Sequence, residues 1–101
     1  MIYEIIIRPE AERDLSEGFN WYEDKRKGLG HDFLLQVDAG IRFLERTPLA
    51  FPEKYKGVRC QLIKRFPYKI FYQVEDSKVV ILAVIHAGRD PEWIKKGVKS
   101  T

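Results

Sequence analysis

The chain has 101 residues, of which 45% are hydrophobic and 33% are charged, and its formal net charge at pH 7 is +3. This length suffices for one hydrophobic core but not for two, so we expect a single domain over residues 1–101. No apolar run approaches the ~18 residues of a membrane span, and the first residues do not resemble a secretion signal, so we expect no membrane association. Cys60 is the only cysteine, which rules out an intrachain disulfide and makes the cytoplasm the expected location.

The positive charge is concentrated in one segment. Residues 53–73 contain six cations and a single anion, so this segment carries +5. A basic region of this kind suits phosphate groups or an acidic protein surface. The alternative is a solvated strand face on which lysines protect a sheet edge. The six cations are Lys54, Lys56, Arg59, Lys64, Arg65 and Lys69.

The first half of the chain predicts a strand followed by a helical hairpin. Residues 2–7 are rich in β-branched side chains, which predicts a strand. Pro9 suits the first turn of a helix, and the apolar residues after it recur at three- and four-residue spacing as far as Asp24. Beyond two glycines, a second apolar stripe predicts another helix, with Asp32 as a possible N-cap and Pro48 as its stop. The two helices are expected to share one apolar seam.

The middle of the chain predicts a loop and then a strand. Residues 49–57 contain a proline and have no clear period, so we expect a loop there. From Val58 the pattern changes to alternation, which predicts a strand. The alternation places Arg59 and Arg65 on one face of this strand and Lys64 on the other.

The last third predicts two further strands and a short helix. Phe66-Pro67 indicates a turn or a bulge, because proline donates no hydrogen bond to a neighbouring strand. Residues 68–75 and 78–86 predict strands joined by a tight reversal. The second of them is apolar on both faces, which predicts a central strand covered on both sides or an open face that a partner covers. Residues 90–97 predict an N-capped short helix or turn that stops at a glycine.

These elements define the predicted fold class. It is α+β, with an N-terminal strand, a helical hairpin, a three-stranded antiparallel meander that completes one sheet, and a short C-terminal helix. Consecutive final strands can pair as a meander, and the two helices must then lay their seam on one face of the sheet.

Candidate functional side chains gather near the ends of the last strands. RNA cleavage without a metal needs a base, an acid and cations around the phosphate. His86 could serve as base or acid near neutral pH, and Tyr68 could stack on a base or donate its hydroxyl. Arg59, Lys64 and Arg65 could clamp a phosphate, although the alternation places Lys64 opposite the other two. His86 could equally be a structural residue that is hydrogen-bonded to a neighbouring strand.

Further cations are candidates for binding a target or a nucleic acid. These are Lys64, Lys69 and Arg89. His31 and His86 lie far apart in the sequence, and neither cysteine nor acidic residues occur at metal-ligand spacing, so we expect no metal site. No cofactor is implied either.

An ordered set of short motifs extends over nearly the whole chain. It comprises Glu10-Ala11-Glu12-Arg13-Asp14-Leu15, Trp21-Tyr22, Gly28-Leu29-Gly30 before Phe33-Leu34, Pro48, Gly57-Val58-Arg59, Arg65-Phe66-Pro67-Tyr68, Tyr72, and His86 followed by Arg89-Asp90-Pro91 and Trp93. None of these motifs is specific by itself. In this order they resemble the RelE/ParE superfamily of bacterial toxins from type II toxin–antitoxin modules.

The resemblance implies a RelE-like toxin fold that a cognate antitoxin neutralises by wrapping its surface. It also implies one of two targets, because some members cut mRNA on the ribosome and others poison DNA gyrase. The segments 66–68 and 86–93 look more like the gyrase-directed and plasmid-stabilisation members. We therefore expect a growth-arresting toxin whose target is gyrase or is unassigned. The alternative is a ribosome-dependent mRNA endonuclease, in which His86, Arg65, Arg59 and Tyr68 would be catalytic.

Overall fold

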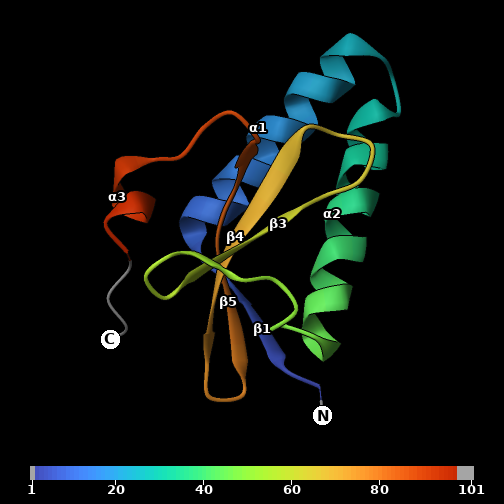
Figure 1. The fold of residues 1–101 in the computed structure, drawn as a ribbon. Helices are drawn as coiled ribbons and strands as arrows, with labels where there is room; N and C mark the ends of the chain where they lie inside the picture. The colour runs from blue at the N-terminus through green and yellow to red at the C-terminus, as the bar shows by residue number, and fades with distance from the viewer. Residues whose placement is uncertain (1, 98–101) are drawn as a thin grey trace.

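A computed structural model describes residues 2–97 of the chain (Figure 1). In chain order the elements are β1 (Glu4–Ile7), α1 (Pro9–Lys25), α2 (Leu29–Arg46), β2 (Glu53–Tyr55), β3 (Val58–Leu62), β4 (Tyr68–Glu75), β5 (Lys78–His86) and α3 (Glu92–Lys95). The predicted α+β class and the order of its elements are confirmed. Within the described range, no helix is both long and apolar enough to cross a membrane.

The strands form one sheet in the order β1-β5-β4-β3-β2. Strands β3, β4 and β5 pair antiparallel, as predicted, and β1 pairs parallel with β5. The register between β4 and β5 shifts once, because Phe71 pairs with Ala83 whereas Tyr72 pairs with Ile81. Leu82 is therefore an extra residue in β5, and such a bulge bends the strand and increases its twist.

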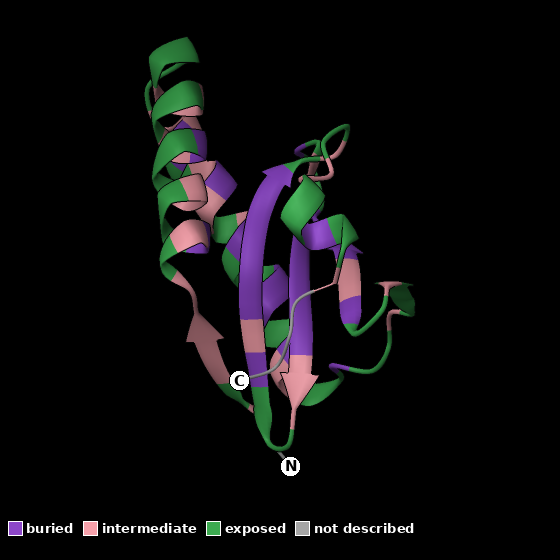
Figure 2. Cartoon of the chain, turned by 90° about the vertical axis from the view of Figure 1, so that its left-hand side faces the viewer, coloured by how far each residue is buried: buried purple, intermediate pink, exposed green. Residues whose placement is uncertain are grey.

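The two faces of the sheet are covered by different parts of the chain. The hairpin of α1 and α2 covers one face, and α3 lies on the opposite side (Figures 1 and 2). Ile94 of α3 is fully buried against a cluster that contains Val58, Phe71 and Leu82. This arrangement explains why β5 is apolar on both faces, and the prediction of a central strand covered on both sides is confirmed.

The turn between α1 and α2 is held by one carboxylate. The two oxygens of Glu23 accept hydrogen bonds from the backbone N–H groups of Gly28 and Gly30, each at 2.9 Å. The hydrogen bond from Gly28 lowers the pKa of Glu23. Gly28 has a φ of 89°, a conformation that favours glycine. The predicted N-cap at Asp32 is wrong, because α2 already begins at Leu29 and Asp32 lies in its first turn.

The prediction of a loop over residues 49–57 is also wrong in part. Residues Glu53–Tyr55 form the edge strand β2, in which Glu53 pairs with Arg59 and Tyr55 with Val58. Three residues are too few to display an alternating pattern, and the preceding Pro52 argued against a strand. The sequence therefore carried no periodic signal for β2.

The predicted alternation along the next strand ends earlier than expected. Strand β3 stops at Leu62, and Arg65 adopts a φ of 71° in the turn before β4. The faces assigned to Lys64 and Arg65 from a continuous strand are therefore wrong. Phe66-Pro67 lies in this turn, as predicted.

Tyr72 makes a buried hydrogen bond that can be tested by substitution. Its side chain is fully buried, its hydroxyl donates to the backbone carbonyl of Pro48 at 2.7 Å, and burial raises the pKa of Tyr72 to about 12. Tyr72→Phe should lower the free energy of unfolding by about 1–2 kcal/mol, because the carbonyl loses its partner. Thermal unfolding followed by circular dichroism should show a fall of roughly 5–10 °C. An unchanged melting temperature would mean that this hydrogen bond contributes nothing to stability.

Candidate functional site

Tyr68 and His86 lie opposite each other at the ends of β4 and β5. Their ring centroids are 5.9 Å apart and the rings are nearly perpendicular. The backbone N–H of Gly88 donates to Nδ1 of His86 at 3.2 Å, which places the proton of a neutral ring on Nε2. The interpretation of His86 as bonded to a neighbouring strand is therefore wrong, because its imidazole bonds to its own turn. The imidazole remains exposed.

Tyr68 is held firmly from the helical side. Its ring packs against Phe33 and Tyr22, with centroid distances of 4.9 and 5.9 Å. Burial raises the pKa of Tyr68, and the nearby Arg89 guanidinium opposes this shift. Arg89 follows His86 in the same turn, where its backbone N–H donates to the carbonyl of His86 at 3.0 Å. Tyr68, His86 and Arg89 are thus brought together by the fold.

A polar cleft of about 380 Å³ lies beside these residues, between α1, β5 and α3. Asp14 lines this cleft, and its carboxylate accepts a hydrogen bond from the backbone N–H of Val84 at 3.0 Å. Val84 lies three residues after Ile81, which is the last residue of β5 that pairs with β1. Burial raises the pKa of Asp14. Sequence reasoning missed this role of Asp14. The available signal was its spacing of three residues from Ala11 and four from Gly18, both of which are buried in α1.

Lys69 occupies a buried structural position rather than a surface one. It is 3% exposed, and its ammonium donates to the carbonyl of Ala87 at 2.8 Å and to the carboxylate of Asp90. Asp90 also accepts from the hydroxyl of Tyr55 and lies 3.0 Å from Nζ of Lys54. Burial opposes the ionisation of Asp90, but these hydrogen bonds hold its pKa well below the usual range.

This ion-paired cluster fixes the segment that connects β5 to α3. The expected N-cap of the last helix is therefore wrong, because the cap position is Pro91 and makes no side-chain hydrogen bond to the helix. The carboxylate of Asp90 instead reaches β4 through Lys69. Sequence reasoning counted Lys69 as part of the basic surface because its counter-ion lies 21 residues away.

Arg59 lies far from the Tyr68–His86 pair and has internal partners. Its Nη1 donates to the carbonyl of Phe51 at 2.5 Å, and Nη2 lies 3.9 Å from Glu53. Arg59 pairs with Tyr72 on β4, whereas His86 pairs with Tyr68. Arg59 and His86 are therefore four residues apart along the strand direction, which corresponds to about 13 Å. They are also two strands apart across the sheet.

The remaining predicted cations lie on the surface. Arg65 is exposed, and its guanidinium carbon lies 5.7 Å from the ring centroid of Phe66. Lys64 is also exposed and lines a different feature, a groove between α2 and β3. The fold therefore does not gather the seven predicted site residues at one point.

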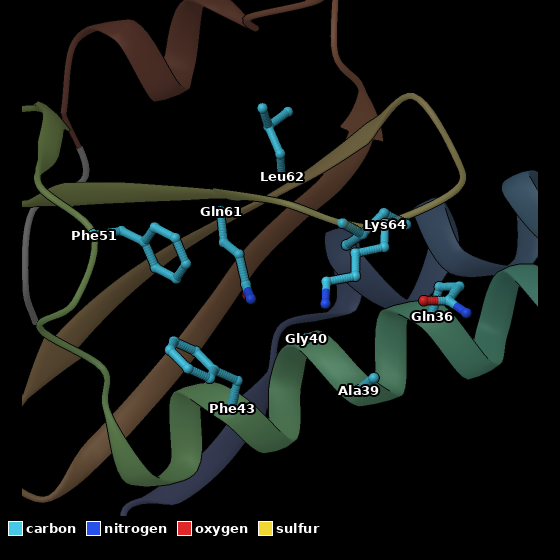
Figure 3. Close-up of a pocket in the computed structure, with 9 residues that line it drawn as sticks. Gln36, Ala39, Gly40, Phe43, Phe51, Gln61, Leu62 and Lys64 are labelled. Carbon is cyan, nitrogen blue, oxygen red and sulfur yellow. The ribbon is translucent and has the colours of Figure 1, made fainter.

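The groove between α2 and β3 has a volume of about 320 Å³ and a mainly apolar lining. Figure 3 shows the side chains of Gln61 and Lys64 pointing toward α2, whereas Leu62 points away. Sequence reasoning missed this groove, because it depends on how α2 lies against β3, which is a tertiary arrangement. The lining residues are Gln36, Ala39, Gly40, Phe43, Phe51, Gln61, Leu62, Ile63 and Lys64.

Comparisons with known proteins agree with this fold. The toxin ParE2 of Mycobacterium tuberculosis, in strains H37Rv and CDC 1551, is 31% identical over 86 residues, which cover 84% of this chain and 82% of the relative. A solved chromosomal ParDE system from P. aeruginosa has the same fold, with a TM-score of 0.76 and 16% identity over 84% of this chain and 96% of that chain. The toxin–antitoxin complex RelBE2 from M. tuberculosis gives a TM-score of 0.55 and 26% identity over 85% and 99% of the two chains. Residues 5–91 match the family described as the ParE toxin of type II toxin–antitoxin system, parDE, so the chain belongs to this ParE toxin family within the RelE/ParE superfamily.

Proposed function

We propose that this ParE-type toxin arrests bacterial growth by binding and poisoning DNA gyrase, and that a cognate antitoxin neutralises it. The observation that carries the choice of target is the dispersal of the cations that an RNA-cleaving site would need. Arg59 is bound to Phe51 and Glu53, and Lys69 is buried against Asp90. Arg59 is therefore remote from His86, and the ammonium of Lys69, although it contacts the carbonyl of Ala87, is buried and neutralised by Asp90.

The chemistry of RNA cleavage makes this dispersal important. A metal-independent ribonuclease must stabilise the additional negative charge on phosphorus with cations close to the acid and the base. Arg89 lies beside Tyr68 and His86, and Arg13 lines the adjacent cleft, but both are accompanied there by the carboxyl groups of Asp14 and Glu17. Carboxylates near a phosphate oppose its binding. A toxin that acts by binding a protein needs a complementary surface and no such convergence of cations on a phosphate.

Two observations support the antitoxin as partner. Solved relatives are a ParDE system and a RelBE2 toxin–antitoxin complex. The chain also exposes several large apolar side chains, among them Leu35 and Phe43 of α2, Leu49 just after it, and Leu62 of β3. Exposed apolar surface of this kind is a common feature of protein interfaces.

A parallel assay of both targets tests the proposed mechanism. Purified protein should inhibit supercoiling by DNA gyrase and should leave mRNA intact on translating ribosomes. The physical reason is that binding requires no convergent acid, base and phosphate clamp. Supercoiling would be followed on agarose gels and message integrity by primer extension.

The opposite pattern would contradict the proposal. Cleavage of mRNA in the ribosomal A site with normal supercoiling would select the endonuclease. As a control for activity, expression of the protein alone should stop growth, and co-expression of the protein encoded by the neighbouring gene should restore it. Normal growth in cells that contain soluble, folded protein would contradict both gyrase poisoning and mRNA cleavage.

A further inference from the structure

We propose that the groove between α2 and β3 is a binding site for a small aromatic carboxylate. The apolar part of the groove would hold the rings of the ligand, and two side chains that end in nitrogen, Gln61 and Lys64, would hold its carboxylate. This inference goes beyond the proposed function and does not depend on it, because it concerns a small ligand that binds the free protein directly.

The groove has the size and the lining of a small-molecule site. Its volume of about 320 Å³ lies near the lower end of the range for ligand pockets, roughly 300–1,000 Å³. Such pockets are mostly apolar and contain a few polar groups that fix the orientation of the ligand. A compound with two fused rings and one short polar substituent is therefore of a suitable size.

Aromatic side chains and small residues form the apolar part of the groove. Phe43 of α2 is 46% exposed, and its ring centroid lies 5.8 Å from that of Phe51. A Cβ atom at Gly40 would lie 3.2 Å from Cδ1 of Ile70 and 3.3 Å from Oε1 of Gln61, so only glycine lets α2 lie this close to the sheet. An aromatic ligand can pack edge to face or offset against the exposed phenyl ring.

Gln61 places an amide without an internal partner in this groove. The residue is only 7% exposed, and its Oε1 has no hydrogen-bond partner among the residues that the structure describes. Figure 3 shows the amide nitrogen pointing from β3 toward α2. Buried polar groups are normally hydrogen-bonded, so an unpaired one indicates a partner that is not part of the chain. A ligand oxygen that accepts from this amide would gain a hydrogen bond without breaking one inside the protein.

Lys64 makes an anion the favoured ligand. Within the described part of the chain, it is the one charged residue in the lining, which contains no carboxylate. Lys64 and Gln61 both point toward α2 (Figure 3), so their N–H groups face the same side of the groove. A carboxylate has two acceptor oxygens and can bind one donor with each. A single ammonium also balances the one charge of a carboxylate, whereas a phosphate would bring more negative charge than the groove can neutralise.

Binding of naphthalene-2-carboxylate to the free protein tests the proposed class of ligand. A titration of ¹⁵N-labelled protein followed by NMR should show saturable binding with a Kd below about 1 mM, and the shifted signals should cluster at Gln61 and Phe43. Neutral naphthalene-2-carboxamide has the same rings and nearly the same shape. It should bind at least about fivefold more weakly, because it has no charge for Lys64 to pair with. Absence of saturable binding, or equal affinities for the two compounds, would overturn the inference.

Substitutions of the two polar side chains test their roles. Lys64→Gln should weaken binding of the carboxylate to the level of the carboxamide and leave the carboxamide unchanged, which is the coupling that a double-mutant cycle measures. Lys56→Gln removes the same charge from an exposed position outside the groove and is the matched control. Gln61→Met should weaken both compounds without lowering the melting temperature, because the amide oxygen has no partner to lose. Equal losses in Lys64→Gln and Lys56→Gln would contradict the role of Lys64.

A blocking substitution tests the place of binding. Ala39→Trp fills the groove from an exposed position on α2, and Asp38→Trp adds the same side chain outside the groove. The carboxylate should bind at least about tenfold more weakly to the first variant and normally to the second. Equal affinities would overturn the groove as the site. Sedimentation of the free protein tests another occupant, because a dimer that Ala39→Trp dissociates would assign the groove to a second copy of this chain and overturn the inference.

Discussion

Replacing Lys69 with methionine should lower the free energy of unfolding by about 3 kcal/mol. Methionine keeps most of the length and apolar character of the side chain but leaves Asp90 without its most buried partner. Removal of one member of a buried ion pair typically costs 3–5 kcal/mol. The lower end applies here, because Asp90 is 16% exposed and retains Tyr55 and Lys54. Thermal unfolding should show a fall of more than about 10 °C.

Lys54 provides a matched control, because it binds the same carboxylate from a more exposed position. Its side chain is 43% exposed, so Lys54→Met should cost less than about 1 kcal/mol. The pKa of Asp90 is lowered in the folded protein, so its ionised form contributes stability above the usual carboxyl pKa and loses this contribution as the pH falls. The difference between wild type and Lys69→Met should therefore shrink below about pH 4. Equal effects of the two substitutions at pH 7 would contradict the structural role of Lys69.

The main elements of the fold could be predicted because their sequence patterns are long and have clear boundaries. Strands β4 and β5 were predicted over residues 68–75 and 78–86, and the structure has these limits. Strand β4 is rich in aromatic and β-branched residues, β5 is a nearly continuous apolar run, and the polar turn at Asp76 and Ser77 separates the two. Strand β2 could not be predicted, because three residues next to a proline display no period. Its presence depends on pairing with β3, which is a tertiary interaction.

The candidate site was harder to predict because its side chains have partners far away in the sequence. Lys69 binds Asp90 across 21 residues, and Asp14 binds the backbone of Val84 across 70 residues. Periodicity indicates which face of an element a residue occupies, but it does not indicate whether a cation on that face has a counter-ion. From the sequence alone, Lys69 was therefore counted among the cations that could bind a target or a nucleic acid. The positions of Tyr68 and His86 at strand ends were predicted correctly, because the limits of β4 and β5 were predicted and these two strands pair with each other.

Arg59 and Arg65, which the sequence grouped with His86, are expected to differ in their effects on stability and on toxicity. Arg59→Ala should destabilise the protein, because the carbonyl of Phe51 loses a charged partner, at a cost of about 1.5–3 kcal/mol. Arg65→Ala removes an exposed side chain and should change stability by less than about 0.5 kcal/mol. Any loss of toxicity in Arg59→Ala should therefore follow the folded fraction, whereas a loss in Arg65→Ala would report a contact with the target.

Substitution of His86 should give very different results for the two mechanisms, RNA cleavage and gyrase binding. As an acid or base, it would contribute at least about 100-fold to RNA cleavage, and any substitution that removes the imidazole would abolish this contribution. As part of a gyrase-binding surface, it should contribute about fivefold to inhibition, the equivalent of ~1 kcal/mol. Because the side chain is exposed, His86→Ala should leave the melting temperature nearly unchanged in either case.

His86→Asn sharpens this comparison. The amide oxygen of asparagine can take the place of Nδ1 and accept the hydrogen bond from the N–H of Gly88, but the amide cannot transfer a proton at neutral pH. If His86 acts by shape and hydrogen bonding, His86→Asn should inhibit gyrase nearly as well as the wild type, and His86→Ala should be the weaker inhibitor. If His86 acts as an acid or base, both variants should lose mRNA cleavage to the same large extent. Supercoiling and A-site cleavage assays on the same preparations would decide between these results, because each mechanism ranks the two variants differently.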